Sequence, residues 1–371
     1  MVLGATVTGP GAEGAESVTE EERAGTDLLA AVARGVIELS RADQAVTFRL
    51  PYPPRIQLAL DRVVLAGLTR DRPVPGSVPE LLAWCRDKDL ADWWPLKLPD
   101  NFLTAGARLV HAVGNEATRT CAELASYGPD GFLEGEAEEV LAILADACGT
   151  EERFAACRDF LIRRPVILEY NPIEFLKPAL AHTWKLVQGI YGPVPDRFRV
   201  HRMVYRCAGC LLLAKPVTVD TSWCEGGCRP GERVLESTRQ PEQTCVLPLG
   251  LRLFLSLPGR TELTVRSRSA RRTHLFRQRT GLHRFVSHDG STRAFQVHDR
   301  EQPVLAALSA AETVAGLDVP LDVVIPDEAA NGPGYREAFG RALPDGVKIR
   351  LLSVSEFTAP RQEGLEEGEH A

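Results

Sequence analysis

Four cysteines in the middle of the chain have the type and spacing of a metal site. Two residues lie within the first pair, thirteen between the pairs and three within the second pair; the cysteines are Cys207, Cys210, Cys224 and Cys228. A tetrahedral Zn2+ ion needs two close pairs of thiolates that a loop brings together. Four unrelated thiols or two disulfides are the alternatives, but close cysteine pairs in a reducing compartment usually bind metal. The spacing therefore predicts a zinc site.

Each cysteine pair lies in a turn-prone setting. Ala208 and Gly209 separate the first pair, and small residues let the backbone curl so that two sulfurs point at one ion. The intervening residues 211–223 are long enough for a short hairpin. Because the protein supplies all four ligands, the Zn2+ would be structural and not catalytic. We expect a zinc ribbon at 199–243 that joins the two halves of the chain.

Length and charge describe a globular chain with acidic ends. A chain of 371 residues is expected to form two or three compact units. The net charge of −7 resides in the ends, because residues 1–25 carry −4 and residues 361–371 carry −3. Segments of this Gly- and Glu-rich kind bury too little apolar surface to fold. We therefore expect disordered acidic tails at 1–26 and 359–371.

The chain lacks the sequence signals of membrane insertion and export. No apolar run reaches the eighteen residues that span a bilayer, and the first residues lack the pattern of a signal peptide. We therefore expect a cytoplasmic protein in a reducing compartment, with no membrane partner. The five cysteines outside the metal motif are expected to be buried small apolar residues: Cys85, Cys121, Cys148, Cys157 and Cys245.

The segment 27–198 predicts an N-terminal all-helical unit. Apolar residues recur at steps of three and four at 27–39, 54–68, 135–149 and 153–164, which is the period of an amphipathic helix. No set of residues with catalytic spacing is visible in this unit. We expect it to be a scaffold or docking surface.

After the cysteines the pattern becomes that of a small α/β domain at 244–358, which begins strand-like. Alternating residues at 282–288 and 292–299 flank an Asp-Gly turn and predict a hairpin. Helices then alternate with strands: 302–316, 321–327, 334–343 and 347–357. The order predicts a mixed sheet, and the fold class of the whole chain is α+β multidomain.

This order of elements is also that of restriction-endonuclease-like folds. Those folds hold Mg2+ with an Asp on one strand and an acid-x-Lys on the next, with a Glu on a preceding helix. Here Leu282 stands on the first strand where the Asp would be needed, and Gln296 and His298 stand on the second strand where the acid and the Lys would be needed. An amide and a neutral imidazole cannot replace carboxylates around a hard cation. Only Glu262 offers an acid on the preceding segment.

Several short motifs occur in a recognisable order along the chain: LPYPPRIQLALDRVV, WCRDKDLADW, TCAELA, YRCAGC, WCEGGC, LPGRTEL, VVIPDEAANGPGYREAF and VKIRLLSVSEF. Over most of its length from about residue 45, the chain resembles the restriction-endonuclease-related domain Y proteins. These are encoded beside PIWI-RE genes in bacterial three-gene defence islands. The resemblance implies a nuclease-like fold and a defence role, with an Argonaute-like PIWI-RE protein and a helicase as partners to test.

The resemblance also places the family's nuclease positions on this sequence. The first metal-binding Asp falls on Leu282, the second on Gln296 and the Lys on His298. The helix acid falls on Glu262, and the acid after the Lys falls on Asp299. Metal-assisted phosphodiester hydrolysis depends on the three groups that are missing. The resemblance therefore implies a pseudo-nuclease.

A cluster of arginines is a second feature of the C-terminal half. Between residues 259 and 285 the single acid is Glu262, and eight arginines are present: Arg260, Arg266, Arg268, Arg271, Arg272, Arg277, Arg279 and Arg284. Such a cluster is the electrostatic footprint expected of phosphate-backbone binding, and arginine suits forked phosphate contacts. A solvated face balanced by acids of the tails or of a partner is the alternative.

Three functional hypotheses follow. We favour a non-catalytic subunit that binds nucleic acid, DNA before RNA, or that acts as an adaptor, with Zn2+ as its structural cofactor. The second is an active metal-dependent DNA nuclease with a migrated site, in which Glu262, Asp289 and Asp299, with His298, bind Mg2+ or Mn2+. The third is a purely structural subunit that contacts protein alone.

Overall fold

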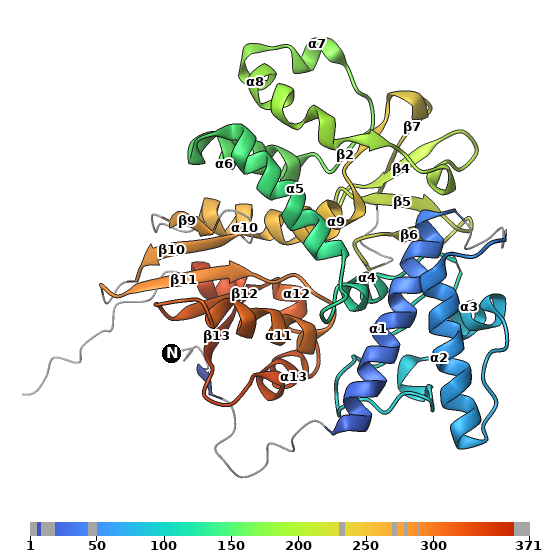
Figure 1. The fold of residues 1–371 in the computed structure, drawn as a ribbon. Coiled ribbons are helices and arrows are strands. Elements are labelled where there is room, and N and C mark those ends of the chain that lie inside the picture. The colour runs from blue at the N-terminus through green and yellow to red at the C-terminus, as the bar shows by residue number, and fades with distance from the viewer. Residues whose placement is uncertain are drawn as a thin grey trace, which may run out of the picture.

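The computed structural model describes residues 6–8, 19–43, 50–113, 115–229, 234–268, 273–277, 281–287 and 290–359. The fold is α+β, with helices first, small sheets around the cysteines next, and a six-stranded sheet last (Figure 1). Short 3-10 helices punctuate the loops: Leu90–Asp92, Gln188–Ile190, Asp196–Phe198 and Pro241–Gln243.

The first four helices share one apolar core. They are α1 (Glu20–Arg41), α2 (Pro54–Arg70), α3 (Val78–Asp87) and α4 (Arg119–Ala125). The first helix begins earlier than expected, so residues 20–26 are helical and do not belong to a tail. Thr19 and Glu22 form a capping box, and the acids of the first turn favour the positive end of the helix dipole.

The next four helices form a second core. They are α5 (Leu133–Cys148), α6 (Glu151–Arg163), α7 (Pro172–Phe175) and α8 (Pro178–Val187). The prediction of an all-helical unit at 27–198 is wrong in one respect, because β2 (Val166–Ile167) and β3 (Gly192–Pro193) lie within it. Both pair antiparallel with β8 (Cys245–Val246), which satisfies backbone groups where the chain leaves the helices.

The cysteine region is a four-stranded antiparallel sheet of order β6-β5-β4-β7. Its strands are β4 (Val204–Cys207), β5 (Leu213–Pro216), β6 (Ser222–Cys224) and β7 (Leu235–Thr238). The predicted hairpin between the cysteine pairs is confirmed, because β5 and β6 are antiparallel neighbours.

The predicted strand-like start at 244 is confirmed by β8, but the segment after β8 is helical. It comprises α9 (Leu249–Leu251), a π-helical turn (Arg252–Ser256) and α10 (Leu257–Arg268). Leu251 and Leu255 pack in the second helical core, and Leu253 and Leu257 pack in the first. A helix that is apolar on several sides lacks a clear helical period, so a short apolar run does not distinguish it from a strand.

The C-terminal domain is built on a mixed sheet, as predicted, with the order β1-β13-β12-β11-β10-β9. Its strands are β1 (Thr6–Thr8), β9 (Thr273–Arg277), β10 (Leu282–Val286), β11 (Thr292–Val297), β12 (Leu321–Ile325) and β13 (Lys348–Ser353). The three strands β11, β12 and β13 are parallel, and the other pairings are antiparallel. The predicted hairpin β10–β11 is confirmed. Strand β1 lies within the expected N-terminal tail, and β9 was not predicted.

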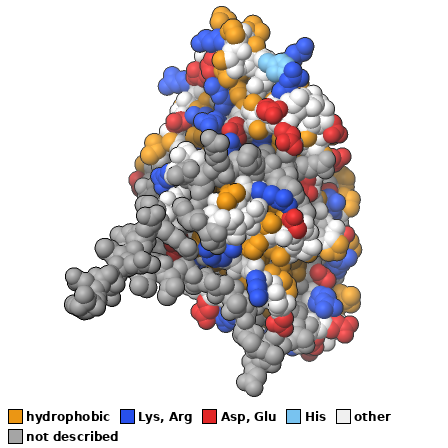
Figure 2. Space-filling model, turned by 90° about the vertical axis from the view of Figure 1, so that its left-hand side faces the viewer, with side chains coloured by type: hydrophobic (Ala, Val, Ile, Leu, Met, Phe, Trp, Pro, Cys, Tyr) orange, Lys and Arg blue, Asp and Glu red, His pale blue; other side chains and the backbone are white. Residues whose placement is uncertain are grey.

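Helices cover both faces of this sheet. Besides α10, they are α11 (Pro303–Val314), α12 (Asp327–Ala330), α13 (Tyr335–Ala342) and α14 (Val354–Thr358). Residues of α11 and α13 pack on one face, and residues of α10 and α14 pack on the other. Figure 2 looks at the side of the molecule where β9 and β10 form the edge of the sheet; basic, acidic and apolar side chains are interspersed among its coloured atoms.

Candidate metal centre and the predicted nuclease positions

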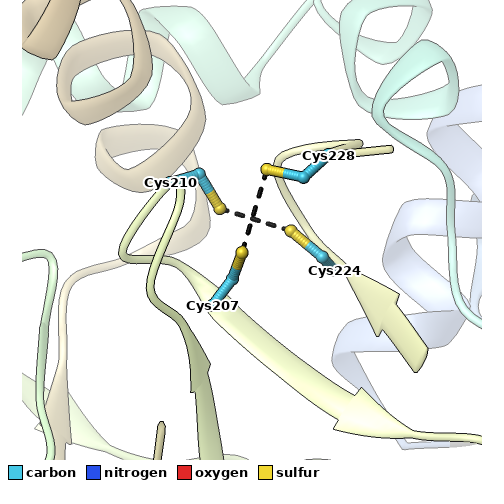
Figure 3. A group of neighbouring side chains, drawn as sticks. All are labelled: Cys207, Cys210, Cys224 and Cys228. Carbon is cyan, nitrogen blue, oxygen red and sulfur yellow. Dashed lines mark hydrogen bonds between the residues drawn. The ribbon is translucent and has the colours of Figure 1, made fainter. Parts of the chain in front are cut away.

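The four predicted ligands converge on one point. Their sulfur atoms all lie within 4.8 Å of one another (Figure 3). Cys207 Sγ lies 3.8 Å from Cys228 Sγ, and Cys210 Sγ lies 3.2 Å from Cys224 Sγ. A tetrahedron with Zn–S bonds of about 2.3 Å separates its sulfurs by about 3.8 Å. Disulfides need sulfurs about 2.05 Å apart, and all nine cysteines are free. The donor set fits a metal such as zinc.

Strand ends and tight turns position these thiols. Cys207 ends β4 and Cys224 ends β6, so each strand delivers the first sulfur of a pair. Gly226 leaves no room for a side chain, because a Cβ there would lie 2.8 Å from Cys210 Sγ. Gly227 has φ +71°, a left-handed conformation that favours glycine. The geometry of the second turn therefore requires both glycines.

Two arginines from other elements contact the cysteine turns. Arg260 of α10 donates to the carbonyl oxygen of Gly209 in the first turn. Arg119 of α4 donates to the carbonyl oxygen of Gly226 in the second turn at 3.4 Å. Four thiolates around one divalent ion leave a net negative charge, which these guanidinium groups offset. The ribbon is thereby tied to both the helical region and the C-terminal domain.

The positions on β10 and β11 that the sequence predicted to be degenerate form an apolar and neutral set. Leu282 is fully buried in the core beneath α11 and α13. Gln296 Oε1 accepts a hydrogen bond from Thr313 Oγ1 at 3.1 Å and lies 3.0 Å from His298 Nε2. Burial, with the nearby guanidinium of Arg300, lowers the pKa of His298 to about 3, so the imidazole is neutral at pH 7. None of the three groups carries the charge that Mg2+ requires.

Glu262, the residual helix acid, is buried on α10 and fully paired. Arg158 Nη1 and Nη2 donate to its two carboxylate oxygens, each at 2.7 Å, and His283 Nε2 lies 2.7 Å from Oε1. Burial by itself would raise the pKa of Glu262, but Arg158 and His283 outweigh burial and lower the pKa to about 2. A guanidinium group therefore occupies the position next to this carboxylate that a metal ion would need.

Nothing in the sequence singles out Arg158, which lies in a helix of ordinary amphipathic pattern 104 residues before Glu262. Gly281 is a second residue of the site that sequence reasoning missed. It has φ +66°, and a Cβ there would lie 2.6 Å from Arg158 Nη2 and 2.8 Å from Glu262 Oε2. The close approach of this backbone encloses the ion pair.

Among the described residues, the other candidates for a migrated nuclease site do not join Glu262 in a metal-binding group. Asp299 pairs with Arg119, with 2.7 Å between Oδ1 and Nη2. Asp289 lies outside the described residues. Within the described part of the chain, the cysteine cluster is the only group of three or more His, Cys, Asp or Glu side chains close enough to share an ion.

A cavity of about 1020 Å³ lies over these predicted nuclease positions, between the helical region and the sheet. Glu262, Gln296 and His298 all line it. Its described lining contains six acidic side chains and two arginines, a formal charge of −4. A negative cavity repels the phosphate backbone of a nucleic acid. The site is therefore unsuited to hold a scissile phosphate without bound metal.

The structure describes four side chains of the arginine cluster, and three of them have partners. Arg260 contacts the ribbon, Arg266 lies 2.9 Å from Asp159 and Arg284 lies 2.6 Å from Asp318. Arg268 is exposed. The remaining side chains lie outside the described ones: Arg271, Arg272, Arg277 and Arg279. On the face in Figure 2, the described cations are scattered among acids.

Two buried groups should make the protein less stable in acid. His298 holds a pKa of about 3 against an ordinary 6.5, so its contribution is complete above pH 6.5 and is lost as pH falls towards 3. Glu262 holds a pKa of about 2 against 4.5, so its contribution is lost as pH falls below 4.5. We expect urea denaturation between pH 7 and 4 to show this loss, at up to about 1.4 kcal/mol per pH unit for each proton. The plot of the free energy of unfolding against pH should become flatter near pH 6 in His298→Gln, but not in His182→Gln, which changes an exposed histidine. The same pH dependence in both variants would contradict the role given to His298.

Comparison with known families links the chain to a defence system. Residues 28–168 match the family model described as "pPIWI_RE three-gene island domain Y". The match runs from within α1 to the end of β2, so it covers neither the cysteine ribbon nor the six-stranded sheet. No curated protein sequence and no solved structure matches the chain. In the part of the chain that the structure describes, every helix is too short or too polar to cross a membrane.

Proposed function

We propose that this protein is a cytoplasmic, non-catalytic subunit of a PIWI-RE-type anti-phage or anti-plasmid defence system. Its restriction-endonuclease-like domain has lost the metal site and serves to hold nucleic acid or a partner protein of the island. One observation carries the proposal: the residual acid Glu262 is buried and neutralised by Arg158 at two hydrogen-bond contacts. The matched domain over residues 28–168 supplies the defence context.

Charge opposes catalysis at the degenerate site. Mg2+ binds carboxylate and other oxygen ligands, and catalysis needs at least one carboxylate free to share the ion with the phosphate. Glu262 and Asp299 each contact an arginine at 2.7 Å instead. An ion that displaced Arg158 from Glu262 would leave a buried cation without its partner, a loss of about 3–5 kcal/mol. No described contact favours the active-nuclease alternative.

The arginine segment 260–284 supports nucleic-acid binding. Its many arginines against a single acid, Glu262, favour phosphate contacts. The ion pairs of Arg266 and Arg284 are partly exposed, and such pairs contribute at most about 1 kcal/mol, so a phosphate can replace the acid. Contacts to phosphate carry no sequence information, which suits a subunit that positions DNA for another component.

A plasmid assay tests the proposal. The purified zinc-loaded chain is incubated with supercoiled plasmid and Mg2+ or Mn2+, with EDTA as the control. We expect the plasmid to stay supercoiled and to be retarded on a low-salt gel. Nicking that EDTA prevents, and that Glu262→Gln or Asp299→Asn removes, would overturn the non-catalytic assignment. Neither nicking nor retardation would favour the purely structural subunit, to be tested by co-purification with the PIWI-RE protein and helicase of the island.

A further inference from the structure

A second large cavity lies on the zinc side of the molecule and differs in charge from the one over the degenerate site. Its volume is about 1350 Å³, and both cysteine turns, the start of α10 and the α12–α13 segment line it. Its described lining contains six arginines and four acidic side chains, a formal charge of +2 that the zinc-loaded cysteine centre in its wall, at −2, brings to zero. The cavity over the degenerate site has a formal charge of −4. A polyanion is therefore repelled from the degenerate site, and on the zinc side the arginines that lack a strong partner decide where it binds.

The acids of the zinc-side cavity are largely engaged by the protein itself. Asp299 pairs with Arg119. Glu301 accepts hydrogen bonds from the backbone nitrogen of Thr120 at 3.1 Å and from its Oγ1 at 2.8 Å. These carboxylates hold α4 against the loop after β11. Arg119, which pairs with Asp299, is correspondingly not available to an incoming phosphate.

Three arginines from different elements remain able to meet a phosphate. Arg229, after the last cysteine, is exposed and has no hydrogen-bond or ion-pair partner among the described residues. Arg341 of α13 pairs only with exposed Glu337 at 3.2 Å, a contact that solvent weakens. Arg260 donates to the carbonyl oxygen of Gly209 and keeps further N–H groups. Each lines the cavity.

The aromatic rings of this cavity do not offer a stacking platform. Trp223 is 4% exposed and Tyr335 is 6% exposed, so neither ring presents a face to a base. Single-stranded nucleic acids are usually gripped by stacking as well as charge. A site with guanidinium groups and buried rings reads the phosphate backbone and ignores base sequence.

We propose that the zinc-side cavity is the nucleic-acid site of this protein, with Arg229, after the last cysteine, and Arg341 of α13 as phosphate contacts. The inference rests on the proposed function and deepens it, because it moves the bound strand away from the degenerate nuclease centre. It also gives the ribbon a second role. The same turns that hold the metal shape the wall of the site.

Fluorescence anisotropy of the full zinc-loaded chain tests the assignment. The probes are a labelled single-stranded 20-nucleotide DNA of mixed sequence, an RNA of the same sequence, the duplex form of that DNA, and oligo(dT). The variant is Arg229→Glu with Arg341→Glu. Its matched control is Arg62→Glu with Arg153→Glu, two exposed arginines outside the cavity with the same change in charge. Zinc content and melting temperature confirm that both variants fold.

We expect the cavity variant to bind at least tenfold more weakly than the control. The slope of log K against log salt should fall in magnitude by about 1.5, for two lost phosphate contacts. Mixed-sequence DNA and oligo(dT) should bind alike. A further variant, Arg266→Glu with Arg268→Glu, changes two arginines outside the cavity. If this variant lost binding while the cavity variant and its control bound equally well, the cavity would not be the binding site, but the proposed function would stand. Absence of binding by the unaltered chain would overturn the nucleic-acid role itself, whereas the plasmid assay tests catalysis separately.

Discussion

The Cys224→Ser variant is expected to lose about one zinc ion per chain and to unfold the ribbon. Binding of a structural zinc contributes about 10–16 kcal/mol in small zinc domains, and that free energy is folding free energy. Cys224 ends β6, and its sulfur lies among three others within 4.8 Å. A hydroxyl group cannot replace a thiolate ligand. Metal analysis of protein purified with a reductant measures the loss directly.

Two variants sharpen this experiment. Cys245→Ser changes a cysteine outside the cluster and should keep its zinc. Gly226→Ala leaves all four ligands in place but would press a methyl group against Cys210 Sγ, so it should weaken zinc binding. Protein purified under reducing conditions without measurable zinc, or zinc retained by Cys224→Ser, would contradict a zinc site built from these four cysteines.

Loss of zinc should also destabilise residues outside the ribbon. Cys207, Cys210 and Cys224 are buried in the same core as α1 to α4. Arg119 joins the second cysteine turn to Asp299 of the C-terminal domain. We therefore expect the zinc-free chain to expose the helical region to proteases as well as the ribbon.

The Arg158→Met variant is expected to be less stable by about 3–5 kcal/mol, because it leaves the carboxylate of Glu262 buried without its cation. Arg158 and Glu262 have side chains that are 4% and 3% exposed, so solvent cannot replace the lost partner. Urea denaturation at pH 7 measures the difference. Arg153→Met, on the exposed surface of the same helix, should change stability by less than about 0.5 kcal/mol.

A double variant separates the ion pair from simple packing. Arg158→Met with Glu262→Leu removes both charges, and apolar replacement of a buried pair is often close to neutral. We expect it to recover about half of the loss, since His283 still lacks the acceptor that lies 2.7 Å from its Nε2. A double variant as unstable as Arg158→Met would show that uncompensated charge is not the cause.

The sequence predicted those features whose determinants are local. The spacing of the four cysteines is short enough that strand ends and glycine turns fix their meeting point. The β10–β11 hairpin and the alternation of α11, β12, α13 and β13 follow from periodicity and turn residues. In each case the residues that decide the structure lie within a few positions of one another.

The sequence did not predict features that depend on distant contacts. The bond between Arg158 and Glu262 joins residues far apart in the chain, and periodicity carries no information on such a pair. The helical segment 249–268 packs in two cores, so its apolar residues show no single face. Strand β1 depends on pairing with β13 across the whole chain length. The bond between Arg158 and Glu262 is also the contact that neutralises the predicted helix acid.

We propose above all that the described residues of the C-terminal domain form no site for a catalytic divalent ion. Titration of the zinc-loaded chain with Mn2+, followed by the electron paramagnetic resonance signal of the free ion, tests this most directly. We predict no saturable site below millimolar Mn2+, because Arg158 and Arg119 already neutralise Glu262 and Asp299. One site per chain that disappears in Glu262→Gln or Asp299→Asn would contradict the non-catalytic assignment.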